Sequence, residues 1–476
     1  MIKFGTSGWR AIIAEEFTFA NVRRVVQAIA VHLKTTRASS VVDRGSSANS
    51  TVIVGYDSRF LSPEFAQTAA EVLTAQGLSV LFSKDFIPTP VVSFHVLHQK
   101  ALGSVNFTAS HNPPNYNGLK LNMSNGAPAS LEVTQDIERL ANNAESVAAA
   151  EGSGHSSSVQ MFDPRPAYLS RLRKLIDVSA LKKAKLKVGA DVLYGTGRGY
   201  LDSLLKEAGC RTTVLHNWRD VTFGGQSPEP AESELKELIQ RMRQEKLVAG
   251  FATDGDADRF GIVDYDGTLL SPNEILPIVL QHLVKRRGQK GFVVRSVMTS
   301  QFLDAVARHY DLAVKETPVG FKYIAESMKD QGFLMGGEES GGLTIAGHVP
   351  EKDGILACLL MAEIRAVEKK SYRDILRALR QQVGPYLSKR INLHLSEPVM
   401  QAVRRRMSTL TPNSLDGWEI KKIVRLDGFK FIFRDDSWLG VRLSGTEPVV
   451  RLYLESDTLK KLKALEQVGL NLIHQS

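Results

Sequence analysis

The segment Thr108–Pro114 places a serine next to a histidine, directly after the apolar run Ala101–Phe107. Its Asn-Pro and Pro-Pro steps disfavour a helix, so we expect Ser110 and His111 on a constrained loop at the carboxyl end of a strand. Ligands of open α/β sheets bind at that edge. The pair could therefore supply a nucleophile and an acid or base. A Ser-His pair taken alone is more often a turn in which the hydroxyl bonds its own backbone.

Three aspartates, Asp254, Asp256 and Asp258, alternate with small residues after a second apolar run, Leu247–Thr253. Carboxylates spaced in this way on a turning backbone can converge on one cation, and hard oxygen ligands favour Mg²⁺ or Ca²⁺. The segment is not an EF-hand loop, because its sixth position is Arg259 instead of glycine. The alternative is a solvated acidic turn. Because a strand aims the three side chains, we predict a metal site here.

A third group, Arg442–Pro448 with Arg451 beyond it, combines guanidinium groups with hydroxyls. The hydroxyls of Ser444 and Thr446 and the flexible backbone of Gly445 could wrap a dianionic phosphate. The segment lacks the Walker-type lysine and the Gly-x-Gly-x-x-Gly pattern of nucleotide-binding loops. As an isolated motif, a Ser-Gly-Thr turn is more often a hairpin loop.

A fourth group, Gly336–Gly342, sets Glu338 and Ser340 between glycines, and Lys352 follows within Pro350–Gly354. Carboxylates and hydroxyls suit the recognition of sugar hydroxyls, and glycine lets the backbone approach a ligand closely. A flexible surface turn is the alternative for this motif by itself.

The elements that must position these groups follow two patterns. Up to about residue 380, apolar runs such as Thr51–Val54 and Phe292–Val297 alternate with helical segments such as Pro63–Gln76. This alternation predicts mostly parallel α/β sheets. The remaining residues form short alternating runs between helices near Pro398–Ser408 and Thr458–Ile473, which predicts an α+β domain with an antiparallel sheet.

We therefore predict an α/β protein with three consecutive α/β domains, built on mixed, mostly parallel sheets, and a smaller C-terminal α+β domain around a central cleft. A polar stretch, Ala38–Ser50, reads as a loop insertion without assignable chemistry. The predicted domains are 1–153 with the serine loop, 154–256 ending in the metal-binding loop, 257–380 with the sugar-recognition loop, and 381–476 with the phosphate-binding loop.

The composition of this chain of 476 residues, 43% hydrophobic and 23% charged, is ordinary for a globular protein. No apolar stretch reaches the ~20 residues that a membrane span needs, and the first residues have no apolar leader. Two cysteines, Cys210 and Cys358, cannot form a disulfide framework. We expect a cytoplasmic protein without membrane association.

The net charge of +9 could attract nucleic acid or small anions. Its longest cationic clusters, Lys285–Arg287 and Arg404–Arg406, lie in helical patterns without interleaved aromatic residues. This argues against a nucleic-acid groove, so we expect no nucleic-acid partner. Small anionic substrates remain open.

Taken together and in this order, the motifs resemble the α-D-phosphohexomutase superfamily over essentially the whole chain. Thr317–Lys322, Phe223–Gly225 and Glu351–Gly354 look most like its phosphoglucomutase branch, whereas the phosphoglucosamine mutase branch usually has glycine at Ala257. Some relatives carry histidine where this chain has Gly342, so no contact from that histidine is carried over. The matching segments are Gly5–Arg10, Thr108–Pro113, Gly118–Lys120, Asp254–Arg259, Gly337–Gly341 and Arg442–Pro448.

The resemblance implies a role for each group. Ser110 would be the phosphorylated residue, and its phosphate oxygen would complete a Mg²⁺ site with the three aspartates. His111 and Lys120 would act as acid and base, and Arg10 and Arg259 would stabilise phosphoryl charge. The implied substrate-binding residues are Thr317, Gly320, Glu338, Ser340, Lys352, Arg442, Ser444, Gly445, Thr446 and Arg451.

The implied activity interconverts hexose 1-phosphate and hexose 6-phosphate, with glucose phosphates favoured over mannose phosphates. It would proceed through phospho-Ser110 and a hexose 1,6-bisphosphate, which also serves as activator. The expected partners are small hexose phosphates, and the chain would be a monomer or a homodimer. One alternative is a metal-dependent sugar-phosphate phosphatase, which would release phosphate. The other is a non-catalytic sugar-phosphate-binding protein, which would be expected to lack Ser110, an aspartate or Lys120.

Overall fold

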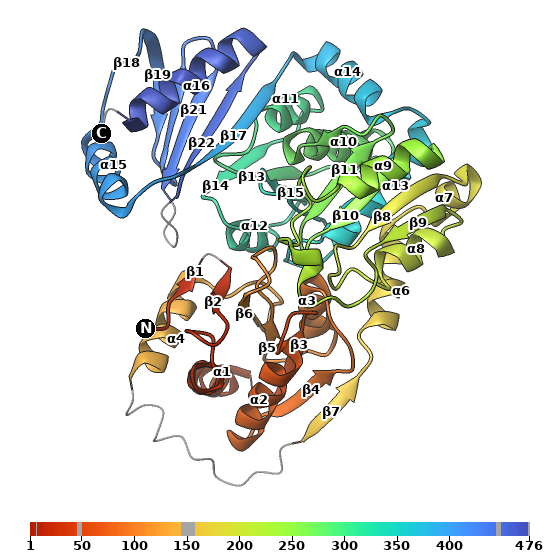
Figure 1. The fold of residues 1–476 in the computed structure, drawn as a ribbon, viewed down its shortest axis with the longest axis vertical. Helices are drawn as coiled ribbons and strands as arrows, with labels where there is room; N and C mark the ends of the chain where they lie inside the picture. Colours follow the sequence, from red (N-terminus) through yellow and green to blue (C-terminus); the bar gives the residue numbers. More distant parts are fainter. Residues whose placement is uncertain (6, 45–49, 144–157, 444–448, 475–476) are drawn as a thin grey trace. The chain divides into compact units, whose positions relative to one another are not determined.

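The computed structural model describes residues 1–5, 7–44, 50–143, 158–443 and 449–474, and it divides into two compact units (Figure 1). The first unit comprises Met1–Leu270 and Ser340–Ser371, and the second comprises Ser271–Glu339 and Tyr372–Ser476. Among the described residues, no helix is long and apolar enough to cross a membrane.

The first sheet of the first unit has the strand order β1-β2-β6-β5-β3-β4-β7. Its core of β5, β3, β4 and β7 is parallel, and β6, β2 and β1 extend it antiparallel. The strands are β1 (Phe4–Gly5), β2 (Gly8–Ile12), β3 (Thr51–Tyr56), β4 (Ser79–Ser83), β5 (Gly103–Phe107), β6 (Tyr116–Met123) and β7 (Val159–Phe162).

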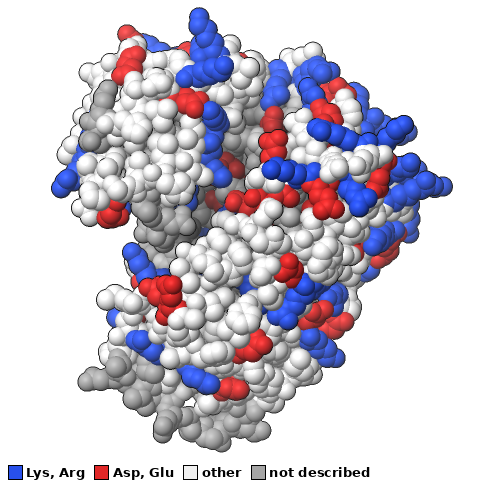
Figure 2. Space-filling model, in the orientation of Figure 1, with Lys and Arg blue, Asp and Glu red and all other residues white. Residues whose placement is uncertain are grey.

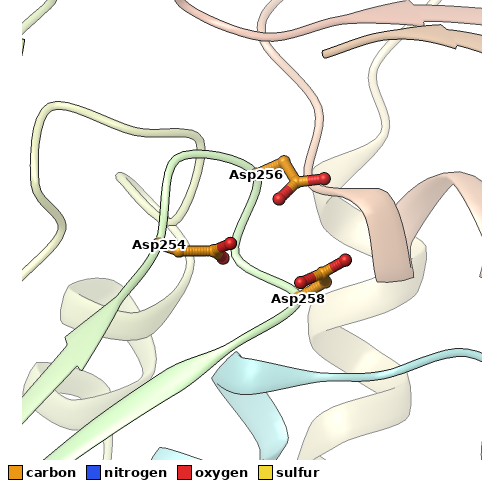
Figure 3. Close-up of side chains that lie close together, drawn as sticks. All are labelled: Asp254, Asp256 and Asp258. Atoms are coloured by element: carbon orange, nitrogen blue, oxygen red, sulfur yellow. The ribbon is translucent and has the colours of Figure 1, made fainter. Parts of the chain in front are cut away.

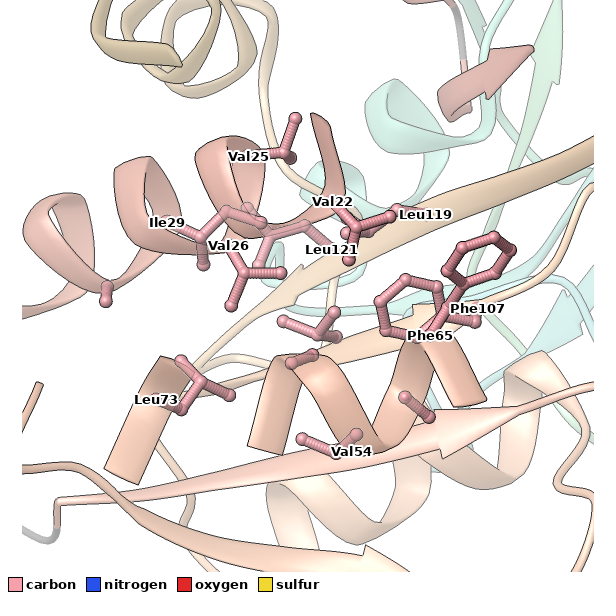
Figure 4. Packing of buried hydrophobic residues seen from close by; sticks show 14 of the residues in the cluster. Val22, Val25, Val26, Ile29, Val54, Phe65, Leu73, Phe107, Leu119 and Leu121 are labelled. Carbon is pink, nitrogen blue, oxygen red and sulfur yellow. The ribbon is translucent and has the colours of Figure 1, made fainter. Parts of the chain in front are cut away.

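Helices α1 (Phe19–Arg44) and α2 (Ser62–Ala75) pack on this sheet and form the core shown in Figure 4. Apolar side chains of α1, such as Val22, meet Phe65 of α2 and Phe107 of β5 in one buried cluster. Strand β5 is buried along its whole length, as expected for a strand covered on both faces. Two further helices complete this part: α3 (Thr89–His98) and α4 (Leu131–Asn142).

Helix α1 corrects one prediction. The polar stretch expected to be a loop from Ala38 is helical as far as Arg44, and residues 45–49 lie outside the described residues. The segment 38–44 contains neither glycine nor proline, so nothing in it interrupts the helix that precedes it.

The second sheet of the first unit has the order β12-β11-β10-β8-β9, with β10, β8 and β9 parallel and β11 and β12 antiparallel. Helix α13 (Gly354–Glu368) packs against β10 and β11, and nearly all its side chains are buried. The remaining elements are β8 (Lys187–Asp191), β9 (Arg211–Leu215), β10 (Ala249–Thr253), β11 (Phe260–Asp264), β12 (Leu269–Leu270), β16 (Gly342–Ile345), α6 (Arg165–Leu175), α7 (Val178–Ala184), α8 (Leu201–Glu207), η1 (Phe223–Gly225) and α9 (Lys236–Glu245).

The second unit contains three parallel strands of the sheet with the order β14-β13-β15-β16, and an antiparallel sheet. Strand β13 lies between β14 and β15 and runs parallel to both. The strands of this sheet and the helices around it are β13 (Phe292–Ser296), β14 (Val314–Thr317), β15 (Phe333–Glu338), α10 (Pro272–Lys285), α11 (Phe302–His309), α12 (Phe321–Ser327) and α14 (Tyr372–Val383).

The antiparallel sheet has the order β17-β22-β21-β20-β19-β18 and packs against α15 and α16 in its own apolar core. A smaller buried cluster, with Met298 and Trp438 at its centre, joins the two sheets of this unit. The C-terminal elements are β17 (Leu387–His394), β18 (Ser414–Leu415), β19 (Trp418–Val424), β20 (Phe429–Phe433), β21 (Trp438–Leu443), β22 (Val449–Ser456), α15 (Glu397–Thr409) and α16 (Leu459–His474).

The predicted fold class is confirmed: three α/β sheets precede an antiparallel C-terminal domain. The boundaries at residues 153, 256 and 380 stay predictions. On the face shown in Figure 2, Lys and Arg side chains are interspersed with Asp and Glu.

Candidate active site

The serine loop and the acidic loop meet in the first unit. Each follows the carboxyl end of a buried strand, β5 for Ser110 and β10 for Asp254. The Ser110 hydroxyl donates a 2.8 Å hydrogen bond to Oδ2 of Asp254. Gly255 of the acidic loop faces the serine loop, because an added Cβ on it would lie 2.6 Å from the Ser110 carbonyl oxygen. Only glycine allows this approach of the two backbones.

Ser110 has a left-handed backbone conformation, with a φ of 52°. Serine adopts this conformation only at a cost of order 1–3 kcal/mol, which the surrounding structure must offset. The Ser110 amide donates to the Thr108 hydroxyl at 2.9 Å, and the Ser110 hydroxyl lies 3.4 Å from Nδ1 of His111. The loop therefore presents the serine hydroxyl between an imidazole and a carboxylate.

Arg59, which the sequence analysis did not select, holds the serine loop in place. Its Nη atoms donate to the carbonyl oxygens of Ser110, Asn112, Pro113 and Tyr116 over 2.7–3.1 Å. Its Nε donates to Oδ2 of Asp57 at 3.2 Å, so all five N–H donors of the guanidinium are used. The side chain is fully buried. The signal that could have revealed it is its place directly after β3, a parallel neighbour of β5.

The three aspartates lie on the loop between β10 and β11 and are fully buried (Figure 3). One carboxylate oxygen from each lies within 4.8 Å of the others, a spacing that one cation can bridge. Oδ1 of Asp256 and Oδ1 of Asp258 are buried and have no hydrogen-bond partner among the described residues. Buried carboxylate oxygens normally have partners. Oxygen donors alone, with two of them unsatisfied, fit a hard divalent cation.

Two lysines complete the cluster. Lys120 on β6 lies 2.5 Å from Oδ2 of Asp256 and 2.7 Å from Oδ2 of Asp258, and Lys352 lies 2.9 Å from the same Asp258 oxygen. Burial alone would lower the pKa of Lys120, but Asp256 and Asp258 outweigh it and raise that pKa. Burial would raise the pKa of Asp258, but the two lysines and Arg259 hold it well below its usual range. Lys120 is therefore a cation at neutral pH.

Packing against the acidic loop fixes the position of Lys352. An added Cβ at Gly354 would lie 2.2 Å from the carbonyl oxygen of Arg259, so helix α13 begins in direct contact with that loop. Asp353 caps this helix by accepting from the Leu356 amide at 2.8 Å, and its other oxygen lies 2.6 Å from Nε2 of His348. The segment Ser340–Ser371 belongs to the first unit, and it places the Lys352 side chain beside Asp258.

The remaining predicted catalytic residues surround the serine. Burial, followed by the charges of Arg259 and Arg10, lowers the pKa of His111 well below its usual range, so its imidazole is neutral at neutral pH. Arg10 donates to the side-chain oxygen of Asn112 at 2.6 Å. The backbone amide of Arg259 donates to Oδ1 of Asp254 at 3.0 Å, and its side chain lies 3.3 Å from Glu229.

The predicted substrate-binding residues are divided between the two units. Ser340 and Lys352 belong to the first unit, and Thr317, Gly320, Glu338, Arg442 and Arg451 to the second. Ser444, Gly445 and Thr446 lie outside the described residues.

Within the second unit, two pairs of these residues lie close together. The Gly320 amide donates to Oε1 of Glu338 at 2.7 Å. Arg442 and Arg451 stand opposite each other on β21 and β22.

A serine hydroxyl held against a buried acidic cluster, with cations around it, is the arrangement of a metal-dependent phosphoryl-transfer enzyme. Four phosphoglucomutase/phosphomannomutase domain families match the chain in order: α/β/α domain I over residues 1–148, domain II over 166–267, domain III over 271–383 and the C-terminal domain over 391–468. The chain belongs to the phosphoglucomutase/phosphomannomutase family of the α-D-phosphohexomutase superfamily, and it is a phosphohexomutase.

Proteins that are similar to this chain over nearly their whole length are named for different sugar phosphates. A phosphoglucomutase/phosphomannomutase of Thermococcus kodakarensis is 29% identical, over 99% of this chain and 98% of its own. A probable phosphoglucosamine mutase of Methanosphaera stadtmanae is 30% identical, over 98% and 97%. A crystal structure assigned to a phosphomannomutase of Thermus thermophilus superposes with a TM-score of 0.84, at 31% identity over 99% of both chains. The reaction class is shared among these names, whereas the sugar differs.

Proposed function

We propose that this enzyme is a phosphoglucomutase that interconverts glucose 1-phosphate and glucose 6-phosphate through phospho-Ser110 and glucose 1,6-bisphosphate. The observation that carries the proposal is the 2.8 Å hydrogen bond from the Ser110 hydroxyl to Asp254, at the edge of a buried carboxylate cluster. A phosphoryl group on Ser110 would stand beside these carboxylates and the lysines that pair with them. We propose hexose phosphates as its ligands and the bisphosphate as its activator.

We propose Mg²⁺ as the ion held by Asp254, Asp256, Asp258 and the phosphate of Ser110. The buried, unpaired Oδ1 atoms of Asp256 and Asp258 support this assignment. A structure of the same fold, an Aspergillus fumigatus N-acetylphosphoglucosamine mutase at 14% identity and a TM-score of 0.58, was solved with GlcNAc-6P and magnesium. Bound there, Mg²⁺ would supply Lewis-acid polarisation of the phosphoryl oxygens.

The residues of the chain supply an acid and a base for the two proton transfers. In the first half-reaction, neutral His111 can accept the proton of the attacking sugar hydroxyl. Charged Lys120 can give a proton to the Ser110 oxygen as its bond to phosphorus breaks. In the second half-reaction the same two groups exchange roles, since the bisphosphate returns its other phosphoryl group to Ser110. Arg10 and Arg259 orient and neutralise the transferred group. The step needs positioning and charge stabilisation more than covalent activation.

The preference for glucose rests on the phosphoglucomutase-like segments, and Glu338 is the residue that we expect to contact sugar hydroxyls. Its carboxylate is already oriented by the Gly320 amide at 2.7 Å. A carboxylate held in one orientation can distinguish sugars that differ in the direction of one hydroxyl. We also propose a cytoplasmic location, because both cysteines are free and buried, as is usual in a reducing compartment.

A coupled assay tests this function. Glucose 1-phosphate is supplied with Mg²⁺ and a trace of glucose 1,6-bisphosphate, and glucose 6-phosphate is measured while phosphate release and mannose 1-phosphate turnover are followed in parallel. We expect fast conversion of glucose 1-phosphate without phosphate release, and its loss in the Ser110→Ala variant. Stoichiometric phosphate release would favour the phosphatase. Faster turnover of mannose 1-phosphate would overturn the sugar assignment, and no turnover of either would favour a binding protein.

A further inference from the structure

A single carboxylate in the second unit links two predicted substrate-binding segments. Asp427 stands in the turn between β19 and β20, and its Oδ2 accepts two hydrogen bonds. One comes from the backbone amide of Val319 at 3.1 Å, and the other from Nε of Arg442 at 3.0 Å. Val319 lies in the loop that begins at Thr317, and Arg442 lies on β21.

The hydrogen bond between Asp427 and Arg442 determines which N–H donors of the Arg442 guanidinium remain for a ligand. A guanidinium has one Nε–H and four Nη–H donors arranged in a planar fork. Among the described residues, Asp427 accepts from Nε and no group accepts from the two Nη atoms. These two atoms form the edge that can meet a phosphate, and two parallel N–H···O bonds are the strongest way to do so. The Arg442 side chain is 16% exposed, so this edge is still reachable.

The contact of Asp427 with Val319 extends the link to the segment after β14, and through it to Glu338, the predicted sugar-recognition residue. The next residue, Gly320, has a φ of 132° and donates its amide to Glu338. Two successive amides of this loop therefore point at two different carboxylates, one on β15 and one on the β19–β20 turn. Loss of either acceptor would leave an amide of the loop without its partner and loosen the segment.

The turn that carries Asp427 is held in place by its neighbours. Gly428 has a φ of 79°, and an added Cβ there would lie 2.4 Å from the Val441 carbonyl oxygen, so the turn packs directly on β21. On β20, the buried Lys430 donates to the Val297 carbonyl oxygen at 2.8 Å and ties this sheet to the parallel sheet. Asp427 is thus fixed by the fold before any ligand arrives.

We propose that Asp427 is a positioning residue: it orients the Arg442 guanidinium toward a substrate phosphate and holds it in register with the predicted substrate-binding segment Thr317–Gly320. This rests on the proposed function, in which Arg442 binds the phosphate that does not react. The consequence is that Asp427 contributes to the binding of either hexose phosphate without touching it. Chemistry at Ser110, in the other unit, should depend on Asp427 only through substrate occupancy.

The test compares Asp427→Ala and Asp427→Asn with Asp436→Asn, an exposed acidic residue in the next turn of the same sheet. For each folded variant, KM and kcat are measured in both directions, and the affinity for glucose 6-phosphate is measured by calorimetry. We expect Asp427→Ala to raise KM and the dissociation constant about tenfold, with kcat changed less than about twofold. Asp427→Asn keeps an oxygen acceptor and should recover part of the loss, and Asp436→Asn should match the wild type.

A double-mutant cycle shows whether Asp427 acts through Arg442. Arg442→Lys alone should weaken binding, and adding Asp427→Ala to it should cost clearly less than Asp427→Ala costs in the wild type. Additive effects, or a loss confined to kcat, would overturn the proposal. Calorimetry separates this from the proposed function: a wild type without mutase activity would refute the latter, whereas unchanged glucose 6-phosphate affinity in Asp427→Ala would refute only the positioning role.

Discussion

At the scale of single residues, the site depends on a serine held in an unfavourable backbone conformation. Ser110 has a φ of 52°, and four carbonyl oxygens of its loop are bound by the buried guanidinium of Arg59. A lysine in that place would have three donors and no planar fork. The backbone conformation of Ser110 is therefore tied to one buried side chain from another element.

We predict that Arg59→Lys lowers kcat about a hundredfold, because it leaves buried carbonyl oxygens unpaired at about 1–3 kcal/mol each and releases the loop. The measurements are steady-state kinetics and the rate of Ser110 phosphorylation by glucose 1,6-bisphosphate, followed by intact-protein mass spectrometry. Arg139→Lys, which changes an exposed arginine paired with Asp136, is the matched control. A folded Arg59→Lys variant that is phosphorylated at the wild-type rate would contradict this role.

Without the family resemblance, the strongest prediction of site residues came from the apolar strands that precede them. Ser110 and the three aspartates each follow such a strand, and the structure brings them together. Arg59 also follows a strand, but a lone arginine in a turn resembles a surface residue. Its function comes from burial and from the four carbonyl oxygens around it, and no local pattern shows these contacts.

At the scale of elements, β5 and β10, which end at the site, were predicted from the sequence, whereas β6, which contributes Lys120 from its interior, was not. Strand β6 was not recognised, because polar residues interrupt its apolar pattern. The structure gives the reason: Lys120 points to the acidic cluster, and Asn122 donates to Glu351 at 3.1 Å. Polar side chains buried against partners from distant segments look like solvent-exposed ones in the sequence.

Helix α3 carries a buried histidine that should make the fold sensitive to acid. Nε2 of His95 lies 2.8 Å from the Pro164 carbonyl oxygen, which can only accept, and Nδ1 is buried without a partner among the described residues. Burial lowers the pKa of His95 to about 4. Because the folded pKa lies below the unfolded value of about 6.5, the unfolded chain binds the proton more readily. The stability is complete above about pH 6.5 and declines as the pH falls toward 4.

We predict that the wild type loses about 2 kcal/mol more unfolding free energy between pH 7 and pH 5 than His95→Gln does, since the glutamine cannot take up this proton. Denaturant unfolding followed by circular dichroism at the two pH values provides the measurement. His98→Gln, at the end of the same helix, is the control. Parallel losses in the wild type and His95→Gln would show that His95 does not carry this linkage.

At the scale of the whole molecule, the proposed chemistry and the proposed substrate recognition are carried by different units. Ser110, the aspartates and Lys120 lie in the first unit, whereas Glu338 and Arg442 lie in the second. The chain also returns to the first unit over Ser340–Ser371, which places Lys352 beside Asp258. The repeating strand–helix pattern predicted the sheets but not this return, because it depends on packing between segments far apart in the sequence.

This division predicts where a bound metal stabilises the molecule. Three buried carboxylates lie within reach of one ion, and Oδ1 of Asp256 and Oδ1 of Asp258 have no hydrogen-bond partner among the described residues. We expect Mg²⁺ to slow amide exchange in β5 and β10, which carry the two loops, and to leave β20 and β21 of the second unit unchanged. The stabilisation should grow with the Mg²⁺ concentration and reach about 2.7 kcal/mol at a hundred times the dissociation constant.

Hydrogen exchange followed by mass spectrometry, with and without EDTA, resolves these segments. Asp256→Asn removes a ligand charge and should abolish most of the Mg²⁺ effect, whereas Asp266→Asn, in the half-buried turn before β12, should retain it. The readout requires no turnover, so it separates metal binding from catalysis. An equal response to Mg²⁺ in both variants would place the ion elsewhere. Protection confined to the first unit would show that the aspartates hold the ion without help from the unit that carries Arg442.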